Sequence, residues 1–484
     1  TQLQPHNAAA LAHHFAAAGE WQTAVTHTQR AAAQAEALYA YEVALSLLNQ
    51  AFALLPHLPQ PEETRRSLLR QRLKLHRTLV QIPAWQADVS ALRQSAQAAN
   101  DSSAQLEALE SQISLLVLQS DFAQVEATAV HALALAEQTG DRLAEARLRQ
   151  TLGWHLADAL GRSREGLAQL QMACALAKEV GATAVFYQSL CHLAFAQRSE
   201  GQCAAARASA AAALALTPYR PDSPPQPAFA DALRELGEAN AYLGNWQVAR
   251  EQLRPLRDLY QTLADPWAYG AVLYNYGLYS SNMGQHEEAI ASLRELVALS
   301  EAVGLPADSD YGIWHRVGLG RVLLAAGKLD EAGALLGGLH TATLGLGRPY
   351  LAWARTVAEY HLLRGEAAAA LAVLQPAVDW WRQAVSLHDA DVLLLLAQAL
   401  LLVGDHAGAV TAVAEATTYL APTDIARYHL RLHWTRYQIS GGPAALAAAR
   451  DELARQAAAF SDTSLRDDFL QNVPLHQQIH QSKT

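Results

Sequence analysis

Cysteine and long apolar runs are scarce in this 484-residue sequence, and basic residues are outnumbered by acidic ones. Three cysteines, Cys174, Cys191 and Cys203, are too few for a disulfide framework in so long a chain. They fit a reducing compartment, where free cysteine behaves as a small core residue, so we expect a cytoplasmic protein. A net charge of −10 at pH 7 argues against direct nucleic-acid binding, because nucleic-acid surfaces are usually basic.

The sequence also lacks a stretch long enough to cross a membrane. The most apolar stretch, DVLLLLAQALLLVG at 391–404, contains Asp391 and Gln398 and falls short of the roughly 18 apolar residues that suggest a membrane span. The N-terminus has no basic region followed by an apolar run, as a signal peptide would. Without these features we expect no membrane partner. The sequence begins inside a helical pattern and has no initiator methionine, so we expect a fragment of a larger protein.

Residues that favour β-strands are few. Alanine and leucine supply most of the 51% of residues that are hydrophobic. Both are strong helix formers, whereas β-branched and aromatic residues favour strands, so the composition predicts an all-α fold. A chain of this length exceeds one compact core, but a repeat protein avoids that limit because each unit packs only on its neighbours.

One phrase recurs along the chain: residues 242–253 read YLGNWQVAREQL, and NMGQHEEAIASL follows about 40 residues later. Seven glycines have an alanine five residues later: Gly19–Ala24, Gly201–Ala206, Gly244–Ala249, Gly284–Ala289, Gly327–Ala332, Gly365–Ala370 and Gly404–Ala409. Another small residue stands seven positions before each glycine: Ala12, Ala194, Gly237, Gly277, Gly320, Ala358 or Ala397. The pattern predicts helical hairpins, in which glycine ends the first helix and small residues let the two helices cross closely.

These hairpins resemble the tetratricopeptide repeat (TPR). In that family the first helix carries a large residue followed by a small one. The glycine turn comes next, and an aromatic residue and an alanine follow on the second helix. Leu236, Gly237, Gly244, Trp246 and Ala249 follow this order. The resemblance implies a right-handed superhelical solenoid of antiparallel helix pairs. Its period of about 40 residues exceeds the usual 34, so we expect longer helices or connections than the family norm.

The repeat pattern divides the chain into five parts. Trp21 and Tyr41 begin helices only 20 residues apart, which makes the first units irregular. Prolines interrupt the array in one place, because proline cannot continue a helix. The expected parts are irregular N-terminal helical repeats (1–60), the first half of a TPR-like array (61–217), a proline-rich loop (218–227), the second half of the array (228–460), and a C-terminal helix with a cap (461–484).

No catalytic motif is present. The sequence has no GxxxxGK[ST] phosphate loop, no HExxH or CxxC metal motif, no GxSxG nucleophile turn, and no GxGxxG after a strand. His13 and His14 are adjacent and therefore point to different faces of a helix, which suits no metal site. We expect a protein that is not an enzyme and holds no metal or cofactor.

Polar and aromatic residues gather where the first helix of each pair would face the concave groove. Aromatic, arginine and asparagine side chains together give a peptide or small-molecule site its contact area and orientation. Alternatively, the aromatic rings fill the spaces between repeats with their polar tips in water. The expected ligand- or partner-binding residues are Arg147, Trp154, Gln188, His192, Arg198, Arg234, Glu238, Tyr242, Tyr274, Asn275, Asn282, Trp314, Arg321, Arg355 and Glu359.

A basic stripe stands apart from the groove. Arg66, Arg70, Lys74 and Arg77 recur at helical spacing within 61–77. They form either a solvated helix face or an interdomain contact with an acidic partner or a domain upstream of residue 1.

The two ends of the chain resemble a particular group of regulators. The stretches LAHHFAAAGEWQTAVTHTQRAAAQAEALYAYEVALSLLNQAFALLP (11–56) and LRDDFLQNVPLHQQI (465–479) are similar to the C-terminal helical array of bacterial signal-transduction ATPases with numerous domains (STAND). The resemblance implies a sensor that binds a protein, a peptide or a small-molecule inducer and restrains an upstream nucleotide-binding domain. The alternative is a passive scaffold that holds protein partners together.

Overall fold

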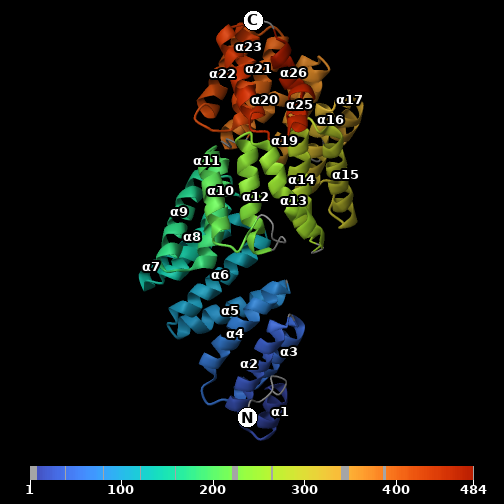
Figure 1. Ribbon diagram of the computed structural model, residues 1–484. Helices are drawn as coiled ribbons and strands as arrows, with labels where there is room; N and C mark the ends of the chain where they lie inside the picture. The colour runs from blue at the N-terminus through green and yellow to red at the C-terminus, as the bar shows by residue number, and fades with distance from the viewer. Residues whose placement is uncertain are drawn as a thin grey trace. The chain divides into compact units, whose positions relative to one another are not determined.

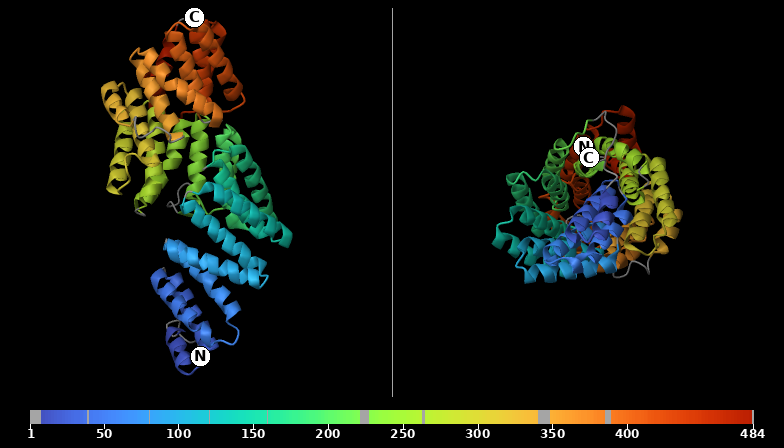
Figure 2. Two further views of the ribbon diagram at one scale, coloured as in Figure 1. Left: turned by 180° about the vertical axis from the view of Figure 1, so that it is seen from behind. Right: turned by 90° about the horizontal axis from the view of Figure 1, so that it is seen from below.

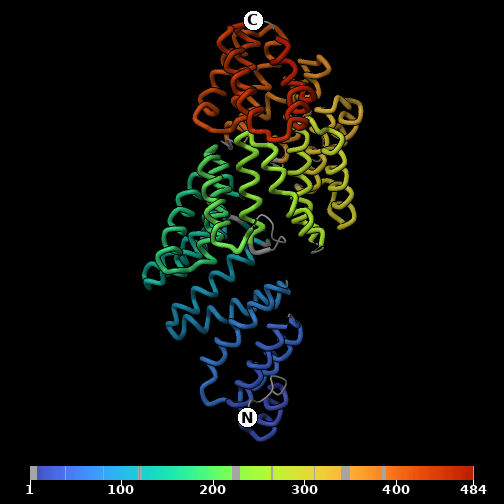
Figure 3. The backbone as a smooth tube through the Cα atoms, in the orientation of Figure 1, coloured from blue at the N-terminus to red at the C-terminus, as the bar shows by residue number. Residues whose placement is uncertain are grey.

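The computed structural model describes residues 8–38, 40–79, 81–119, 121–158, 160–220, 227–262, 265–339, 348–384 and 389–482. These residues form helices and turns and contain no β-strand, so the predicted all-α fold is confirmed for them. Most helices pack on the next one along the chain, and the two helices of such a pair run in opposite directions (Figures 1 and 3).

Contacts divide the chain into two compact units. The N-terminal unit comprises Thr1–Leu160 and Met172–Val185, and the C-terminal unit comprises Gly161–Gln171 and Phe186–Thr484. The expected proline-rich loop lies inside the C-terminal unit, and its residues 221–226 fall outside the described residues.

Helices make up the N-terminal unit almost entirely, and α9 (Ser163–Glu179) contributes residues to both units. A short 3-10 helix, η2 (Leu55–His57), follows the third α-helix. The N-terminal α-helices are α1 (Ala8–Ala17), α2 (Trp21–Ala37), α3 (Tyr41–Ala53), α4 (Pro61–Thr78), α5 (Ile82–Ala98), α6 (Ser102–Leu118), α7 (Phe122–Thr139) and α8 (Arg142–Ala157).

The C-terminal unit continues the same pattern of helical hairpins, seen from behind and from below in Figure 2. Its helices are α10 (Thr183–Ser199), α11 (Cys203–Ala215), α12 (Pro227–Tyr242), α13 (Trp246–Thr262), α14 (Pro266–Asn282), α15 (His286–Ala302), α16 (Asp310–Ala325), α17 (Leu329–Gly337), α19 (Arg348–Leu363), α20 (Ala367–Ala384), α21 (Val392–Leu402), α22 (His406–Leu420), α23 (Ala426–Ser440), α24 (Pro443–Ala457), α25 (Thr463–Gln471) and α26 (Pro474–Gln481).

The predicted hairpin joints are confirmed. All seven repeat glycines have positive φ, between 70° at Gly201 and 85° at Gly404. The small residues meet at the crossings: a Cβ on Gly277 would lie 2.8 Å from Cγ of Leu293 and 3.3 Å from the backbone oxygen of Ala289. Only glycine therefore permits this approach of α14 to α15, and the partner Ala289 is fully buried.

The end of the C-terminal unit folds back onto hairpin turns that come about 200 residues earlier (Figure 1). Asp424 accepts hydrogen bonds from the backbone N–H groups of Cys203 (2.5 Å) and Ala204 (2.7 Å) at the start of α11. Trp246 Nε1, at the start of α13, donates to Gln456 on α24 (3.2 Å). The helices α12 to α14 consequently share one apolar core with α23 to α26.

The last segment forms two helices rather than the expected helix and cap. Phe469 on α25 and Ile479 on α26 are fully buried. Gln285, which precedes α15, donates to Asp468 (2.5 Å), and His286 contacts the carbonyl oxygen of Asn472 (3.0 Å). The segment packs against the turn between α14 and α15 because these residues give it both apolar and polar partners.

The apolar stretch at 391–404 forms α21, in which Val392 and Leu393 are buried at 0% exposure. Among the described residues, no helix combines the length and the hydropathy that crossing a membrane demands.

Candidate functional site

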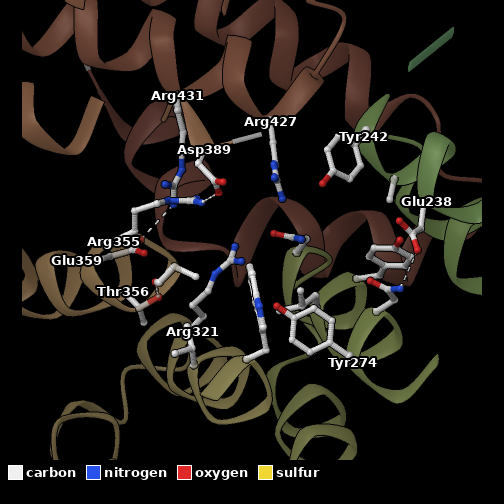
Figure 4. Close-up of a pocket in the computed structure, with 18 of the residues that line it drawn as sticks. Glu238, Tyr242, Tyr274, Arg321, Arg355, Thr356, Glu359, Asp389, Arg427 and Arg431 are labelled. Carbon is white, nitrogen blue, oxygen red and sulfur yellow. Dashed lines mark hydrogen bonds and ion pairs between the residues drawn. The ribbon is translucent and has the colours of Figure 1, made fainter. Parts of the chain in front are cut away.

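A polar cavity of about 210 Å³ lies in the C-terminal unit, among the first helices of successive hairpins (Figure 4). Side chains from α12, α14, α16, α19, α21 and α23 line it, together with Trp246 at the start of α13 and Asp389 just before α21. A single water molecule needs roughly 10–15 Å³ measured in this way, so the cavity has room for a small molecule or part of a peptide. We call it the polar cavity below.

The polar cavity brings together nine of the residues expected to face a groove. They come from four helices and include three aromatic residues, Tyr242, Tyr274 and Trp314; the ring centroids of Tyr274 and Trp314 lie 6.5 Å apart in an edge-to-face arrangement. Their role in binding stays a prediction. The nine are Glu238, Tyr242, Tyr274, Asn275, Asn282, Trp314, Arg321, Arg355 and Glu359.

The other six expected residues lie outside the lining. Arg147 and Trp154 are on α8 of the N-terminal unit, where Arg147 forms an ion pair with Glu110 (3.0 Å). Gln188 and His192 are partly buried on α10. Arg198 and Arg234 contribute to a buried charge cluster beside the polar cavity rather than to its lining.

The buried charge cluster centres on Glu238. Its carboxylate accepts hydrogen bonds from Arg198 (2.6 Å), Arg234 (3.2 Å) and the side-chain amide of Asn275 (3.1 Å). Burial alone would raise the pKa of Glu238, but Arg198 and Arg234 outweigh it and hold the pKa below its ordinary value. Burial keeps the pKa of Glu235, the other carboxyl of this cluster, above its ordinary value. Glu238 is therefore an anion whose charge Arg198 and Arg234 stabilise.

A second set of ion pairs lies across the polar cavity. Arg355 binds Asp389 (2.8 Å) and Asp391 (2.6 Å), and Arg431 binds Glu359 (3.1 Å). Burial would raise the pKa of Asp391, but Arg355, Arg431 and other nearby arginines overcome it and lower the pKa. These pairs join α19 to α23 and to the residues just before α21.

Two arginines of the lining lack a carboxylate partner. Arg427 stacks over the rings of Tyr242 (4.9 Å) and Tyr428 (4.8 Å) and donates to the Tyr428 hydroxyl (3.1 Å). Within the part of the chain that the structure describes, Arg427 forms no ion pair, and Arg321 forms neither an ion pair nor a hydrogen bond. Burial and the positive charges of Arg355 and Arg427 lower the pKa of Arg321. The centre of the polar cavity is therefore electropositive.

Tyr279 adds an unused polar group to the lining. Its ring is 5% exposed, and its hydroxyl has no hydrogen-bond partner among the described residues. Burial and the negative charge of Glu238 raise the pKa of Tyr279 well above its ordinary value, so the hydroxyl stays protonated. It remains a hydrogen-bond donor.

The lining residues of α23 and the acid that precedes α21 were not predicted from the sequence. Arg431 stands ten residues before Gly441, as Arg355 stands ten before Gly365, and Gly441 also has positive φ. Arg431 could have been predicted by counting back from Gly441 as from the other turn glycines. It was not predicted because Trp434 occupies the position of the small residue that precedes each of the other turns by seven. Asp389 belongs to no repeat position.

A second cavity, of about 270 Å³ and mainly apolar, adjoins the polar one. Tyr274, Asn275 and Trp314 line both cavities. The exposed rings of Trp267 and Tyr311 stand 5.7 Å apart and border the apolar cavity.

The basic stripe of α4 is largely engaged within the chain. Arg66 forms an ion pair with Asp101 (3.2 Å), and Arg70 forms one with Glu107 (2.8 Å). Lys74 pairs with Glu36, whereas Arg77 is exposed. These pairs connect α4 with α2 and α6, and the interdomain role stays a prediction.

The polar side chains in the lining of the polar cavity are arginine, glutamate, aspartate, asparagine, threonine, tyrosine and tryptophan. Its lining, as far as the structure describes it, contains no histidine, cysteine, lysine or serine that could act as a nucleophile or a general base near pH 7. No group of three metal-ligating side chains occurs among the described residues.

The fold and the repeated hairpins define a TPR-like helical-repeat protein. The chain is similar to the apo form of RapI, with 9% identity over 74% of this chain and 98% of RapI, at a TM-score of 0.55. It is also similar to PH0952 from Pyrococcus horikoshii, a STAND protein with a tetratricopeptide repeat sensor. That similarity has 11% identity and a TM-score of 0.51 and covers 75% of this chain and 53% of PH0952. No protein-family model and no curated protein matches the sequence.

Proposed function

We propose that this chain is a non-catalytic sensor array of a larger signal-transduction protein, and that it binds an inducer or a peptide in the polar cavity. One observation carries the proposal: nine residues selected from the sequence as groove-facing line a single cavity with both aromatic and charged walls. Such a mixture of apolar area and a few placed polar groups is typical of ligand sites. The similarity in fold to a STAND protein with a TPR sensor supports the larger context, in which an upstream nucleotide-binding domain acts in the cytoplasm.

Ligand binding would act through the helices that line the cavity. A ligand in the cavity contacts the first helices of successive hairpins, whose mutual rotation changes the curvature of a repeat array at little energetic cost. The response is allosteric only when the ligand binds one arrangement of these helices better than another.

The test is a screen of metabolites and peptides by thermal shift, with the double variant Tyr274→Ala/Trp314→Ala. Ligands that stabilise the wild type should fail to stabilise the double variant. Tyr360→Ala, on the same array but outside the cavity lining, is the matched control and should keep the response. Circular dichroism establishes that the double variant remains helical. If no compound or peptide distinguishes the wild type from the double variant, the sensor proposal is wrong.

A further inference from the structure

Arg321 on α16 and Arg427 on α23 enter the polar cavity from opposite sides (Figure 4). A buried positive charge is costly without a partner, because protein replaces the water that would solvate it. Arg355 and Arg431 beside them are already paired with carboxylates. Arg321, Arg355, Arg427 and Arg431 thus face the three carboxylates of Glu359, Asp389 and Asp391, which leaves one positive charge more than these acids neutralise and leaves Arg321 and Arg427 without a carboxylate at ion-pair distance.

The geometry of the guanidinium group narrows the choice of partner. Its planar fork donates parallel hydrogen bonds to the oxygens of a carboxylate or a phosphate. The Tyr279 hydroxyl, buried and unpartnered in the same lining, is one more donor. Arg321, Arg427 and Tyr279 therefore offer the cavity hydrogen-bond donors that a ligand with acceptor oxygens could use.

The aromatic part of the lining indicates what the rest of the ligand, beyond its acidic group, is like. The rings of Tyr242, Tyr274 and Trp314 give the cavity apolar walls close to the unpaired arginines. Buried aromatic faces bind planar or apolar groups, whereas a fully hydrated inorganic ion gains nothing from them. The ligand has to satisfy both parts of the lining.

We infer that the polar cavity binds a small organic anion, whose carboxylate or phosphate group lies between Arg321 and Arg427 and whose apolar body packs on the tyrosine and tryptophan rings. This inference rests on the proposed function and names its ligand class.

The experiment uses phenyl phosphate and benzoate as probes, with benzyl alcohol as the neutral counterpart, at one ionic strength adjusted with sodium chloride. Thermal shift and titration calorimetry on the full chain should show binding of at least one of the two anions and none of benzyl alcohol. Arg321→Gln and Arg427→Gln should each weaken anion binding tenfold or more. Arg294→Gln, which removes an exposed arginine paired with Glu331, is the matched control and should bind as the wild type does.

The melting temperature without a ligand distinguishes a variant that has lost its binding site from one that has merely unfolded. Without a ligand, Arg321→Gln relieves repulsion from Arg355 and Arg427, so its melting temperature should equal or exceed that of the wild type. The inference is overturned if neither anion binds, if benzyl alcohol binds as well as they do, or if Arg321→Gln retains the affinity. A neutral or cationic compound whose binding depends on Tyr274 and Trp314 would also overturn it, while leaving the sensor proposal standing.

Discussion

At the scale of single residues, the C-terminal unit depends on buried charges that neutralise one another. Arg198 is 5% exposed and lies against Glu235 (3.5 Å) and Glu238 (2.6 Å). Its guanidinium group also lies 5.2 Å from the ring of Tyr242. Removing one member of such a cluster leaves uncompensated charge in a medium that solvates it poorly.

We therefore expect Arg198→Ala to lower the free energy of unfolding by about 3–5 kcal/mol, because two buried carboxylates then share Arg234 as their one remaining arginine partner. Arg294→Ala, which breaks an exposed ion pair with Glu331, should cost about 0–1 kcal/mol. Urea denaturation of both variants measures the difference. Equal losses would mean that the buried cluster contributes no more than a surface pair.

The turn glycines provide a second matched comparison. Gly244 and Gly404 have nearly the same φ, 83° and 85°, so alanine is similarly strained at both positions. A Cβ at Gly244 would also lie 2.8 Å from Cγ of Gln456, whereas nothing lies within 4 Å of one at Gly404. Gly244→Ala should therefore destabilise the protein by about 1–3 kcal/mol more than Gly404→Ala, as an overpacked contact does. Thermal denaturation gives the comparison, and equal melting temperatures would refute the contact between α24 and this turn.

Sequence spacing predicted the glycine conformations and the alanine crossings because both are local properties that recur with the repeat. It also predicted nine of the lining residues, since they occupy equivalent positions on equivalent helices. It could not predict that Arg321 lacks a carboxylate while Arg355 has two. Those pairings depend on Asp389 and Asp391, which come from a connection between helices and belong to no repeated position.

At the scale of helices, α25 and α26 dock through a small buried surface. His476 on α26 is 6% exposed, and its Nδ1–H donates to the carbonyl oxygen of Phe469 (2.7 Å). Burial lowers the pKa of His476 to about 4, although the Phe469 hydrogen bond opposes the shift. The neutral ring is therefore the form that holds α26 in place.

This docking should make stability depend on pH. The unfolded chain binds a proton at His476 below about pH 6.5, but the folded chain binds it only below about pH 4. The unfolding free energy should therefore fall by about 3 kcal/mol from this group as pH drops from 6.5 to 4. His476→Asn, whose amide N–H keeps a donor for the carbonyl, should flatten the profile in that window. Urea denaturation at pH 5, 6 and 7 measures it, and an unchanged slope in the variant would contradict the assignment.

The repeat pattern did not predict that this segment forms two helices, although it predicted the helices of the hairpins. The stretch 461–484 carries no glycine–alanine pair, so the repeat offered no frame for it. Its position is fixed instead by contacts distant in sequence, such as those of Asp468 with Gln285 and of Asn472 with His286. No local pattern encodes such a partner.

At the scale of the whole molecule, the chain is an array whose C-terminal unit closes on itself. Residues after 420 cap α11, support the turn before α13 and cover the turn before α15. The prediction from the repeat was a series of units that each contact only their neighbours. The long-range contacts make the C-terminal unit more interdependent than that.

Deletion of residues 461–484 should reveal this interdependence. It removes the buried Phe469 and Ile479 and the hydrogen bonds to Gln285. We expect a lower melting temperature and faster amide hydrogen exchange in the first turns of α13 and α15, far from the deletion in sequence. As a control, Leu68→Ala opens a cavity in the N-terminal unit and should leave exchange in those turns unchanged. Faster exchange confined to α23 and α24 in the deletion would argue against the closure.

The cap that Asp424 places on α11 also bears on how the protein is made. Most helical repeats can begin folding while the ribosome is still extending them, because each new hairpin needs only the previous one. Here the start of α11 waits for an acceptor that is translated 220 residues later. The block between them should therefore mature only near the end of synthesis, and its refolding should be slow for an all-helical protein because its contacts span so much chain.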